Sequence, residues 1–485
     1  MKYGLSSEEL DTIRAHLARQ PGIRQAVLFG SRVLGTFKEA SDIDIALKGE
    51  GLDLFTCGSL KSRLEDETNI PYFFDFVAYD TLTNEALRQH IDTHGVCIYG
   101  EGEGGSGWRE LKLSDFVELG RDQFKPNQAA DLNYIGLEHI EQEKLRLNSV
   151  GHSSEIASNK FFFKVGDVLF GKLRPYFRKV VKARFDGVCS TDIWVVRAKG
   201  NFSQDFVFYF MANWEFIDTA NAGEGGSRMP RADWNFLKNT EWSIPEYAEQ
   251  KAIAAVLSSL DDKIDLLHRQ NKTLESMAAT LFRQWFVEEA QEDWNDGVIS
   301  DLVEFNPPRK LAKGTIAPYL EMASLSTTTF NPEGWYDREF SSGTKFINGD
   351  TLLARITPCL ENGKTAYVTI LNNDQVGWGS TEYIVMQPKG DLHPFFAYVL
   401  ARNSDFRDFA EGCLAGSSGR QRVETNHLMS YKIKMPAEDI VKKFNAVAES
   451  IAPKLHSNAV QIRTLEKLRD TLLPKLMSGE VRVAA

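Results

Sequence analysis

Three features that would assign this chain to a special class are missing from its sequence. No stretch approaches the roughly 18 consecutive apolar residues of a membrane span, and the start, MKYGLSSEELDTIRAHL, has neither the charged entry nor the apolar run of a signal peptide. The five cysteines lie far apart without a C-x-x-C pair, which excludes a zinc ribbon, a disulfide framework and a dithiol redox centre. We therefore expect a cytoplasmic protein that makes no membrane contact and whose cysteines are buried free thiols.

Complete catalytic motifs are also missing from the part of the chain after residue 108. Gly363-Lys364-Thr365 is similar to the end of a phosphate-binding P-loop, but Pro358 stands where that loop requires glycine. Asn306-Pro307-Pro308 is similar to the catalytic tetrapeptide of adenine methyltransferases, but Arg309 replaces its aromatic residue. The nine histidines include no H-E-x-x-H spacing. We therefore expect no catalytic site in this part of the chain.

Length and charge predict several soluble domains, of which the first is acidic. A domain takes about 100 to 200 residues, so 485 residues predict three or more units, and 42% hydrophobic with 25% charged residues is typical of folded soluble proteins. The net charge is -11, but residues 1–105 hold 10 basic and 17 acidic side chains, and the remainder holds 46 and 50. Because phosphates respond to the local field, the nearly neutral remainder can still present a basic face to nucleic acid.

One unit occurs twice after a glycine-rich segment. Residues 100–107, GEGEGGSG, have no side chain that can pack, which is typical of a flexible linker. Beyond it, a G-D-[VT]-L segment and a later S-T-[DE] segment occur in residues 165–196 and again in 348–386. Pro245 and Pro436 are 191 residues apart, as are Leu281 and Leu472. We predict two copies of this unit, each beginning with a strand-rich half.

The second half of each copy has the spacing of a coiled coil. The apolar positions alternate by four and three through Ile253, Leu257, Leu260, Ile264, Leu267, Asn271, Leu274, Ala278, Leu281 and Trp285. The other copy has Phe444, Ala448, Ile451, Leu455, Asn458, Ile462, Leu465, Arg469, Leu472 and Leu476. We predict two antiparallel helices of about 43 residues and ~65 Å that pack on each other, with Asn271 and Asn458 fixing the register at some cost in stability.

Near the start of the chain, a glycine turn precedes two carboxylates. A buried strand is predicted to end at Phe29, Gly30 and Ser31 follow, and Asp42 and Asp44 stand in a second strand. Because strand side chains alternate, the two aspartates share one face. Two such carboxylates beside a turn can hold magnesium and a nucleoside triphosphate, with turn N–H groups and the serine hydroxyl on the phosphates.

A third acid supports this prediction. Ile43 and Ile45 should point into the core, and Asp75 stands in another apolar strand, where a charge is costly unless it is paired or bound to a cation. The alternative is that Asp42 and Asp44 form a solvated strand face.

These residues resemble the signature G-S-x10-D-x-D, followed by a distant aspartate, of the minimal nucleotidyltransferases of the polymerase-β superfamily. The resemblance covers residues 1–100 and implies the use of Mg²⁺ and ATP. It implies catalytic and metal-binding roles for Asp42, Asp44 and Asp75, the last as metal ligand or general base, and nucleotide binding by Gly30, Ser31 and Arg32. A retained but inactive fold is the alternative.

Basic residues stand at matching turns of the two copies. Arginine suits both phosphate and guanine recognition, and glycine-rich loops allow close backbone approach. Taken singly, each is an ordinary solvated charge, but their recurrence in both copies makes them candidate DNA contacts: Lys172, Arg174, Arg228 and Arg231 in the first copy, and Arg355, Arg420 and Arg422 in the second.

Residues 108–480 resemble the specificity subunit of type I restriction-modification systems. The resemblance rests on the paired G-D-[VT]-L and S-T-[DE] segments, the helix entry from Gln250 to Ile264, and the ending from Leu472 to Val481. It implies two target-recognition domains that each read half of a bipartite site in double-stranded DNA, and helices that set the spacing. It also implies methyltransferase and motor-nuclease subunits as partners.

The sequence therefore predicts a multidomain α+β protein, in which two mixed α/β recognition domains follow an α/β nucleotidyltransferase domain and are separated by an antiparallel coiled coil. The expected parts are 1–99 (nucleotidyltransferase), 100–107 (linker), 108–245 (first recognition domain), 246–292 (central helix), 293–436 (second recognition domain) and 437–480 (C-terminal helix). The alternative function is an AMP-transferring antitoxin or regulator whose second part is a protein-binding scaffold.

Overall fold

The computed structural model describes residues 3–38, 41–100, 108–126, 131–222, 229–416 and 420–483. The chain divides into two compact units, Met1–Val256 with Leu472–Ala485 and Leu257–Thr471, and each is described by itself. Within the described ranges, none of the helices combines the length and the apolar character that crossing a bilayer requires. Residues 101–107 of the expected linker lie outside the described residues, and Gly100 ends a strand.

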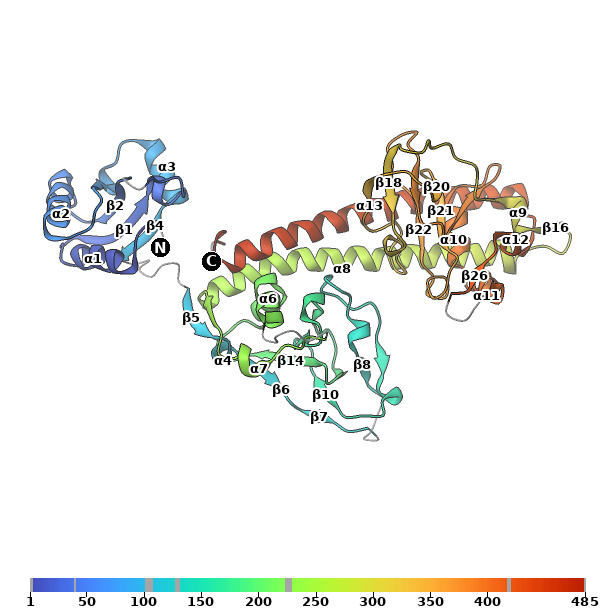
Figure 1. Ribbon diagram of the computed structural model, residues 1–485, viewed down its shortest axis with the longest axis horizontal. Helices are drawn as coiled ribbons and strands as arrows, with labels where there is room; N and C mark the ends of the chain where they lie inside the picture. The colour runs from blue at the N-terminus through green and yellow to red at the C-terminus, as the bar shows by residue number, and fades with distance from the viewer. Residues whose placement is uncertain are drawn as a thin grey trace. The chain divides into compact units, whose positions relative to one another are not determined.

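The front region, residues 3–100, is built on a four-stranded mixed sheet of order β3-β2-β1-β4 (Figure 1). Strand β1 is antiparallel to both of its neighbours, whereas β2 and β3 are parallel. Ile43 and Ile45 are fully buried, which confirms the predicted alternation of β2. The elements are α1 (Ser7–Ala18), β1 (Ile23–Phe29), η1 (Gly30–Arg32), β2 (Ile43–Gly49), α2 (Leu54–Glu67), β3 (Phe74–Ala78), η2 (Tyr79–Thr81), α3 (Glu85–His94) and β4 (Val96–Gly100).

Short polar side chains start the helices of this region. Ser6 and Glu9 form a capping box at α1, because the serine Oγ accepts from the Glu9 N–H and the Glu9 carboxylate accepts from the Ser6 N–H. Asp53 caps α2 and Asn84 caps α3 in the same way, by accepting a backbone N–H three residues on.

The first copy contains three sheets, of orders β7-β10-β13-β8-β9, β12-β11-β14-β6 and β15-β5. Its elements are β5 (Arg109–Lys112), α4 (Leu113–Phe116), β6 (Val117–Gly120), β7 (Gln123–Phe124), β8 (Asn133–Ile135), η4 (Leu137–His139), β9 (Gly151–His152), η5 (Ser153–Glu155), β10 (Lys160–Phe163), β11 (Val168–Gly171), η6 (Pro175–Phe177), β12 (Val180–Lys182), β13 (Gly187–Cys189), β14 (Ile193–Ala198), α5 (Gln204–Ala212), α6 (Trp214–Ala222), α7 (Trp234–Leu237) and β15 (Glu241–Ile244).

The second copy repeats this topology. The sheet β22-β21-β24-β17 corresponds to β12-β11-β14-β6, the sheet β19-β18-β23-β20 corresponds to β9-β8-β13-β10, and the pair β16-β27 corresponds to β5-β15. Its elements are β16 (Asp296–Val298), α9 (Ile299–Leu302), β17 (Val303–Phe305), β18 (Ile316–Leu320), η8 (Met322–Ser324), β19 (Tyr336–Glu339), β20 (Thr344–Phe346), β21 (Thr351–Ala354), β22 (Thr365–Tyr367), β23 (Gly377–Gly379), β24 (Tyr383–Pro388), α10 (Phe395–Arg402), α11 (Ser404–Gly412), β25 (Leu414–Ala415), β26 (Arg422–Val423), α12 (Thr425–Met429) and β27 (Lys432–Lys434).

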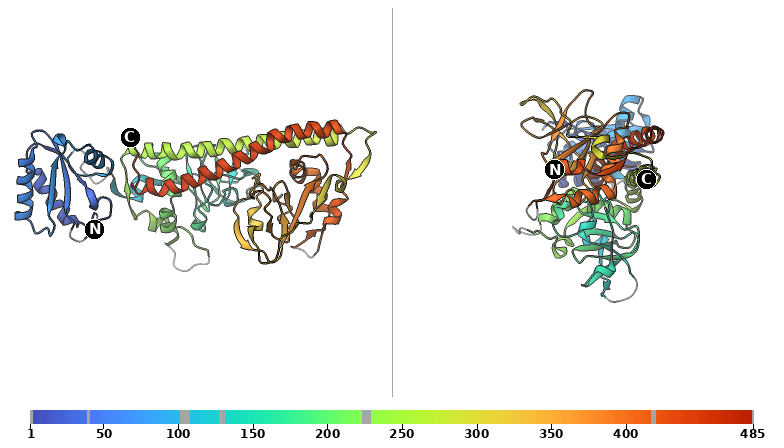
Figure 2. Two further views of the ribbon diagram at one scale, coloured as in Figure 1. Left: turned by 90° about the horizontal axis from the view of Figure 1, so that it is seen from above. Right: turned by 90° about the vertical axis from the view of Figure 1, so that its right-hand side faces the viewer.

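Two long helices carry the predicted coiled-coil seam: α8 (Tyr247–Arg283) and α13 (Glu438–Met477). In the unit Leu257–Thr471 they lie side by side (Figure 2) and are antiparallel, because Asn271 contacts Asn458 while the earlier Asp261 contacts the later Arg469. The Asn458 amide donates to Oδ1 of Asn271 at 2.8 Å, as expected of a register-fixing pair.

The predicted seam differs from the structure at the end of α8. Phe282 and Phe286 are buried in the core of the second copy, whereas Leu281 and Trp285 are only half-buried. A π-helical segment, Gln284–Glu288, follows α8 there and holds Phe286 against Phe396 and Phe444. The four-and-three spacing ends early because the large aromatic rings pack into the adjoining globular core.

Candidate functional site

The glycine turn of the front region lies against one of the predicted acids. Strand β1 ends at Phe29, which pairs with Asp44 of β2, and Gly30 then turns the chain with φ +78°. An ideal Cβ on Gly30 would lie 3.0 Å from Cγ of Asp44, so a side chain at this position would collide with the carboxylate. Glycine is needed here both for its backbone conformation and for this close approach.

The register of the sheet brings two of the three acids together. Asp44 pairs directly with Asp75 of the parallel strand β3, whereas Asp42 lies just before β2, which begins at Ile43. Burial raises the pKa of Asp44, and the charges of Asp75 and Asp42 raise it further. Asp75 is exposed, so its charge is solvated on the open face of β3 and is not held in an apolar interior as the strand composition suggested.

Arg32 differs from the residue that the motif led us to expect. Its side chain is 1% exposed, and it donates Nε to the carbonyl oxygens of Ser41 and Asp42 at 3.2 and 3.0 Å. Nη1 donates to the Tyr3 carbonyl at 3.2 Å, and the guanidinium lies over the Tyr72 ring, 4.1 Å from its centroid. Arg32 therefore shapes the segment that carries Asp42, a role different from the expected contact with phosphates.

One further side chain reaches this face without a signal in the sequence. His90 of α3 lies edge-on to Phe29, with ring centroids 6.4 Å apart, and its charged form would lower the pKa of Asp44. His90 stands four residues before His94 in α3, and no motif of the sequence linked it to the acids of the front region.

The residue types of these acids suit a divalent cation, but their side chains do not converge on one point in the structure. Across the part of the chain that the structure describes, no three Asp, Glu, His or Cys side chains are close enough together to hold a metal ion. Magnesium prefers carboxylate oxygens, and a cation would relieve the repulsion that raises the pKa of Asp44. The metal set Asp42, Asp44 and Asp75 stays a prediction.

In the first copy, the predicted basic residues flank the end of β11. Lys172 follows the strand directly, and Arg174 has a left-handed backbone (φ +52°) with its guanidinium 5.9 Å from the Phe177 ring centroid. Arg231 is exposed and forms an ion pair with Asp192 at 3.4 Å. Arg228 lies outside the described residues.

In the second copy, two of the three predicted arginines contact one carboxylate. Arg422 donates Nη2 and Nε to Glu382 at 2.7 and 2.9 Å, and Arg355 donates Nε to the same carboxylate at 3.2 Å. These hydrogen bonds, led by that from Arg422, hold the pKa of Glu382 below its usual value, so it stays ionised. Arg420 is exposed. Sequence reasoning gave no role to Asp192 and Glu382, although both close the S-T-[DE] segment.

The two rejected motifs have structural roles. Lys364 donates to the carbonyl of Met322 at 3.2 Å, and Thr365 begins a buried strand. Arg309 pairs with the fully buried Asp350 at 2.9 Å.

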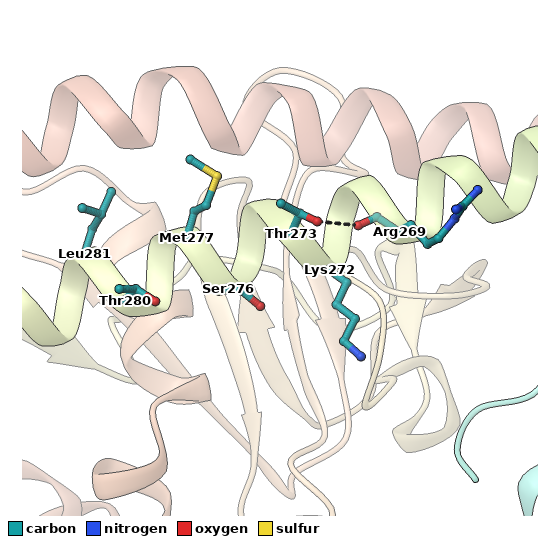
Figure 3. Close-up of a pocket in the computed structure, with 7 residues that line it drawn as sticks. All are labelled: Arg269, Lys272, Thr273, Ser276, Met277, Thr280 and Leu281. Atoms are coloured by element: carbon teal, nitrogen blue, oxygen red, sulfur yellow. Dashed lines mark hydrogen bonds between the residues drawn. The ribbon is translucent and has the colours of Figure 1, made fainter. Parts of the chain in front are cut away.

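A shallow groove runs along one face of α8 (Figure 3). Apolar atoms of Met277 and Leu281 line it next to the cations Arg269 and Lys272, and none of the predicted site residues contributes to it.

Comparison with known proteins follows the same division of the chain. Residues 11–103 match the family model for polymerase beta nucleotidyltransferases, and residues 105–276 match the model for the type I restriction modification DNA specificity domain. Two family models therefore divide the chain, a nucleotidyltransferase model over the front region and a type I specificity model over the residues that follow. The second match includes the first copy and most of α8.

Curated relatives are similar to a larger part of the chain than the family models. The type I restriction enzyme HindI specificity subunit of Haemophilus influenzae is 21% identical over 459 residues, covering 78% of this chain and 100% of the relative. The MjaIX specificity subunit of Methanocaldococcus jannaschii is 23% identical over 305 residues, covering 58% and 69%. A crystal structure of a type I S subunit from M. genitalium aligns with 14% identity and a TM-score of 0.46, covering 76% of this chain and 96% of that one.

Proposed function

We propose that residues 108–480 act as the DNA-recognition subunit of a type I restriction-modification complex. The observation that carries this proposal is the duplication, because both copies share three corresponding sheets, which among the described residues differ only by β7 and the β25–β26 pair, and the same arginine–carboxylate contact. Two similar recognition domains suit a bipartite site in double-stranded DNA, of which each copy reads one half. The relatives that are specificity subunits support this assignment.

In this proposal the long helices set the distance between the half-sites. The 37 residues of α8 and the 40 of α13 correspond to about 55 to 60 Å of helix each, somewhat shorter than the sequence suggested. We keep the domain bounds expected from the sequence, 1–99, 108–245 and 293–436 for the globular parts and 246–292 and 437–480 for the helical parts, although β4 includes Gly100 and the helices α8 and α13 are shorter than these parts. The partners are methyltransferase and motor-nuclease subunits, and the complex works in the cytoplasm, where its DNA is found.

The front domain is proposed to transfer AMP from ATP to an acceptor hydroxyl in the presence of Mg²⁺, with pyrophosphate as the leaving group. Bound magnesium would neutralise phosphate charge during the transfer. Asp42 and Asp44 would hold the metal, with Asp75 as a further ligand or as the base that accepts the proton of the attacking hydroxyl. The Gly30-Ser31 turn would bind phosphates through its N–H groups and the serine hydroxyl, and Arg32 would keep the Asp42 segment in place.

Methylome sequencing tests the main assignment. Cells that express this protein with its cognate methyltransferase should carry a bipartite methylated motif with an unread gap, and cells that express the methyltransferase alone should not. Absence of any motif, combined with nucleotide labelling of a partner protein by the purified chain, would favour the antitoxin alternative.

A further inference from the structure

The two copies share a frame of backbone hydrogen bonds around their basic turns. In the first copy, the N–H of Lys172 donates to the carbonyl of Asp192 at 2.9 Å, and the N–H of Ala232 donates to the carbonyl of Lys172 at 2.8 Å. The N–H of Arg174 donates to the carbonyl of Pro230 at 2.7 Å. The turn after β11, the S-T-D segment and the end of the glycine-rich loop are thereby fixed to one another.

The second copy repeats each of these bonds. The N–H of Arg355 donates to the carbonyl of Glu382 at 3.0 Å, the N–H of Val423 to the carbonyl of Arg355 at 2.9 Å, and the N–H of Thr357 to the carbonyl of Gln421 at 3.0 Å. The frame therefore equates Lys172 with Arg355 and Asp192 with Glu382, and it holds although few side chains agree between the copies.

In each copy, a serine side chain holds the acid of the S-T-[DE] segment in position. Oγ of Ser190 accepts the N–H of Asp192 at 3.2 Å, and Oγ of Ser380 accepts the N–H of Glu382 at 3.1 Å. This local hydrogen bond fixes the turn at which the acid stands. The S-T-[DE] segment therefore fixes the position of one carboxylate in each copy.

In both copies, this acid forms an ion pair with the arginine that follows the glycine-rich loop. Arg231 pairs with Asp192 at 3.4 Å, and Arg422 pairs with Glu382 at 2.7 Å. An isolated β-bridge also ties the backbone of each arginine to the turn, through Leu173 in the first copy and Ile356 in the second. Backbone and side chain of the arginine are therefore both restrained.

These arginines remain partly open to solvent. The side-chain exposed fraction is 55% for Arg231 and 41% for Arg422, against 31% and 21% for their acids. A guanidinium has five N–H donors in a planar fork, and in the second copy Arg422 shares them between Glu382 and the carbonyl of Arg420, to which Nη1 donates at 3.5 Å. In the second copy, Arg355 adds a second guanidinium on the same carboxylate, which leaves an excess of positive charge there.

We propose that this duplicated unit is a DNA-contact site in each copy, in which Asp192 and Glu382 are positioning residues that aim Arg231 and Arg422 at base edges. The proposal rests on the proposed function of DNA recognition and names residues that determine its specificity. A restrained guanidinium that is partly exposed can present its planar fork in one orientation, which suits the two acceptors of guanine in the major groove. The positions beside the frame differ between copies, Arg174 against Thr357 and Lys172 against Arg355, as different half-sites require.

Exchange of each acid for its amide tests this inference. Glu382→Gln and Asp192→Asn keep size and hydrogen-bonding atoms but remove the charge that orients the arginine. Cells that express each full-length variant with the cognate methyltransferase are examined by methylome sequencing. In each variant, the preference for the correct base over the other bases should fall about tenfold or more at one or two base pairs of one half-site. The two variants should affect opposite half-sites.

Two further variants separate recognition from folding. Arg422→Lys keeps the positive charge but loses the fork, and should relax the same half-site as Glu382→Gln. Glu361→Gln changes an exposed acid of the same copy and should leave the motif intact. Intact half-sites in both amide variants would overturn the inference, as would equal weakening of both half-sites by a single variant. A wild-type chain without any bipartite motif would instead refute the proposed function itself.

Discussion

Deleting one heptad from each long helix should shorten the unread gap of the DNA site. Two facing segments can be deleted together, residues 263–269 of α8 and 460–466 of α13. They contain the small apolar cluster of Ile264, Leu267, Ile462 and Leu465. Removing both segments takes this cluster out as a whole. It leaves the polar pairs on either side of the cluster, Asn271 with Asn458 and Asp261 with Arg469, able to form again.

The size of the change is set by helix geometry. Seven residues at ~1.5 Å each shorten the helix pair by about 10 Å, which corresponds to roughly three base pairs of B-DNA at 3.4 Å each. A heptad is nearly two whole turns, so the seam of each helix keeps facing its partner.

Methylome sequencing of the double-deletion chain measures the gap directly. We expect both half-sites to be unchanged and the gap to be about three base pairs shorter. As a control, deletion of 263–269 alone puts Asn271 out of register with Asn458 and should destabilise the helix pair without yielding a new spacing. A double deletion that methylates the original motif with the original gap would refute the role of the helices in setting the distance.

Three further predictions concern single sites. The double variant Asp42→Asn, Asp44→Asn should lose Mg²⁺-dependent incorporation of labelled nucleotide into a partner protein or RNA while the methylated motif stays intact; a loss of both would contradict independent domains. Gly30→Ala should destabilise the front domain by ~1–2 kcal/mol through its left-handed backbone, and should abolish nucleotide transfer because its Cβ would meet the Asp44 carboxylate. Gly35→Ala is the matched control, since its φ of +71° carries the same strain but its Cβ would meet nothing within 4 Å; equal activities of the two variants would show that the contact with Asp44 is unimportant. Arg469→Ala should lower the free energy of unfolding by about 3–5 kcal/mol, because Arg469 is 1% exposed and pairs with Asp261 and Asp470; chemical denaturation checks this value against Lys467→Ala, an exposed position of the same helix.

Periodic features of the chain could be predicted from the sequence. The strand alternation that buries Ile43 and Ile45 and the seam that pairs Asn271 with Asn458 are local patterns, because each follows from spacing along one element. The duplication was visible for the same reason: it is a repeat of residue types in order. The acids Asp42 and Asp44 were found because their chemistry is unusual on a buried strand.

Contacts between distant segments could not be predicted in this way. Nothing near Arg32 in the sequence indicated that its guanidinium would bind the carbonyls of Ser41 and Asp42. Likewise, Arg355 and Arg422 looked like independent cations, and only the fold brings both to Glu382. At the end of α8, Phe282 replaces Leu281 in the interior because a neighbouring globular core competes with the coiled coil for the helix face.

The central claim, that each copy reads one half of a bipartite DNA site, is tested most directly by making the two copies identical. Residues 293–436 are replaced by a second copy of residues 108–245, and the methylome of cells that carry this chain with its methyltransferase is sequenced. Because the helices are antiparallel, we predict a palindromic motif made of two inverted copies of one original half-site. A motif that keeps both original half-sites would contradict it.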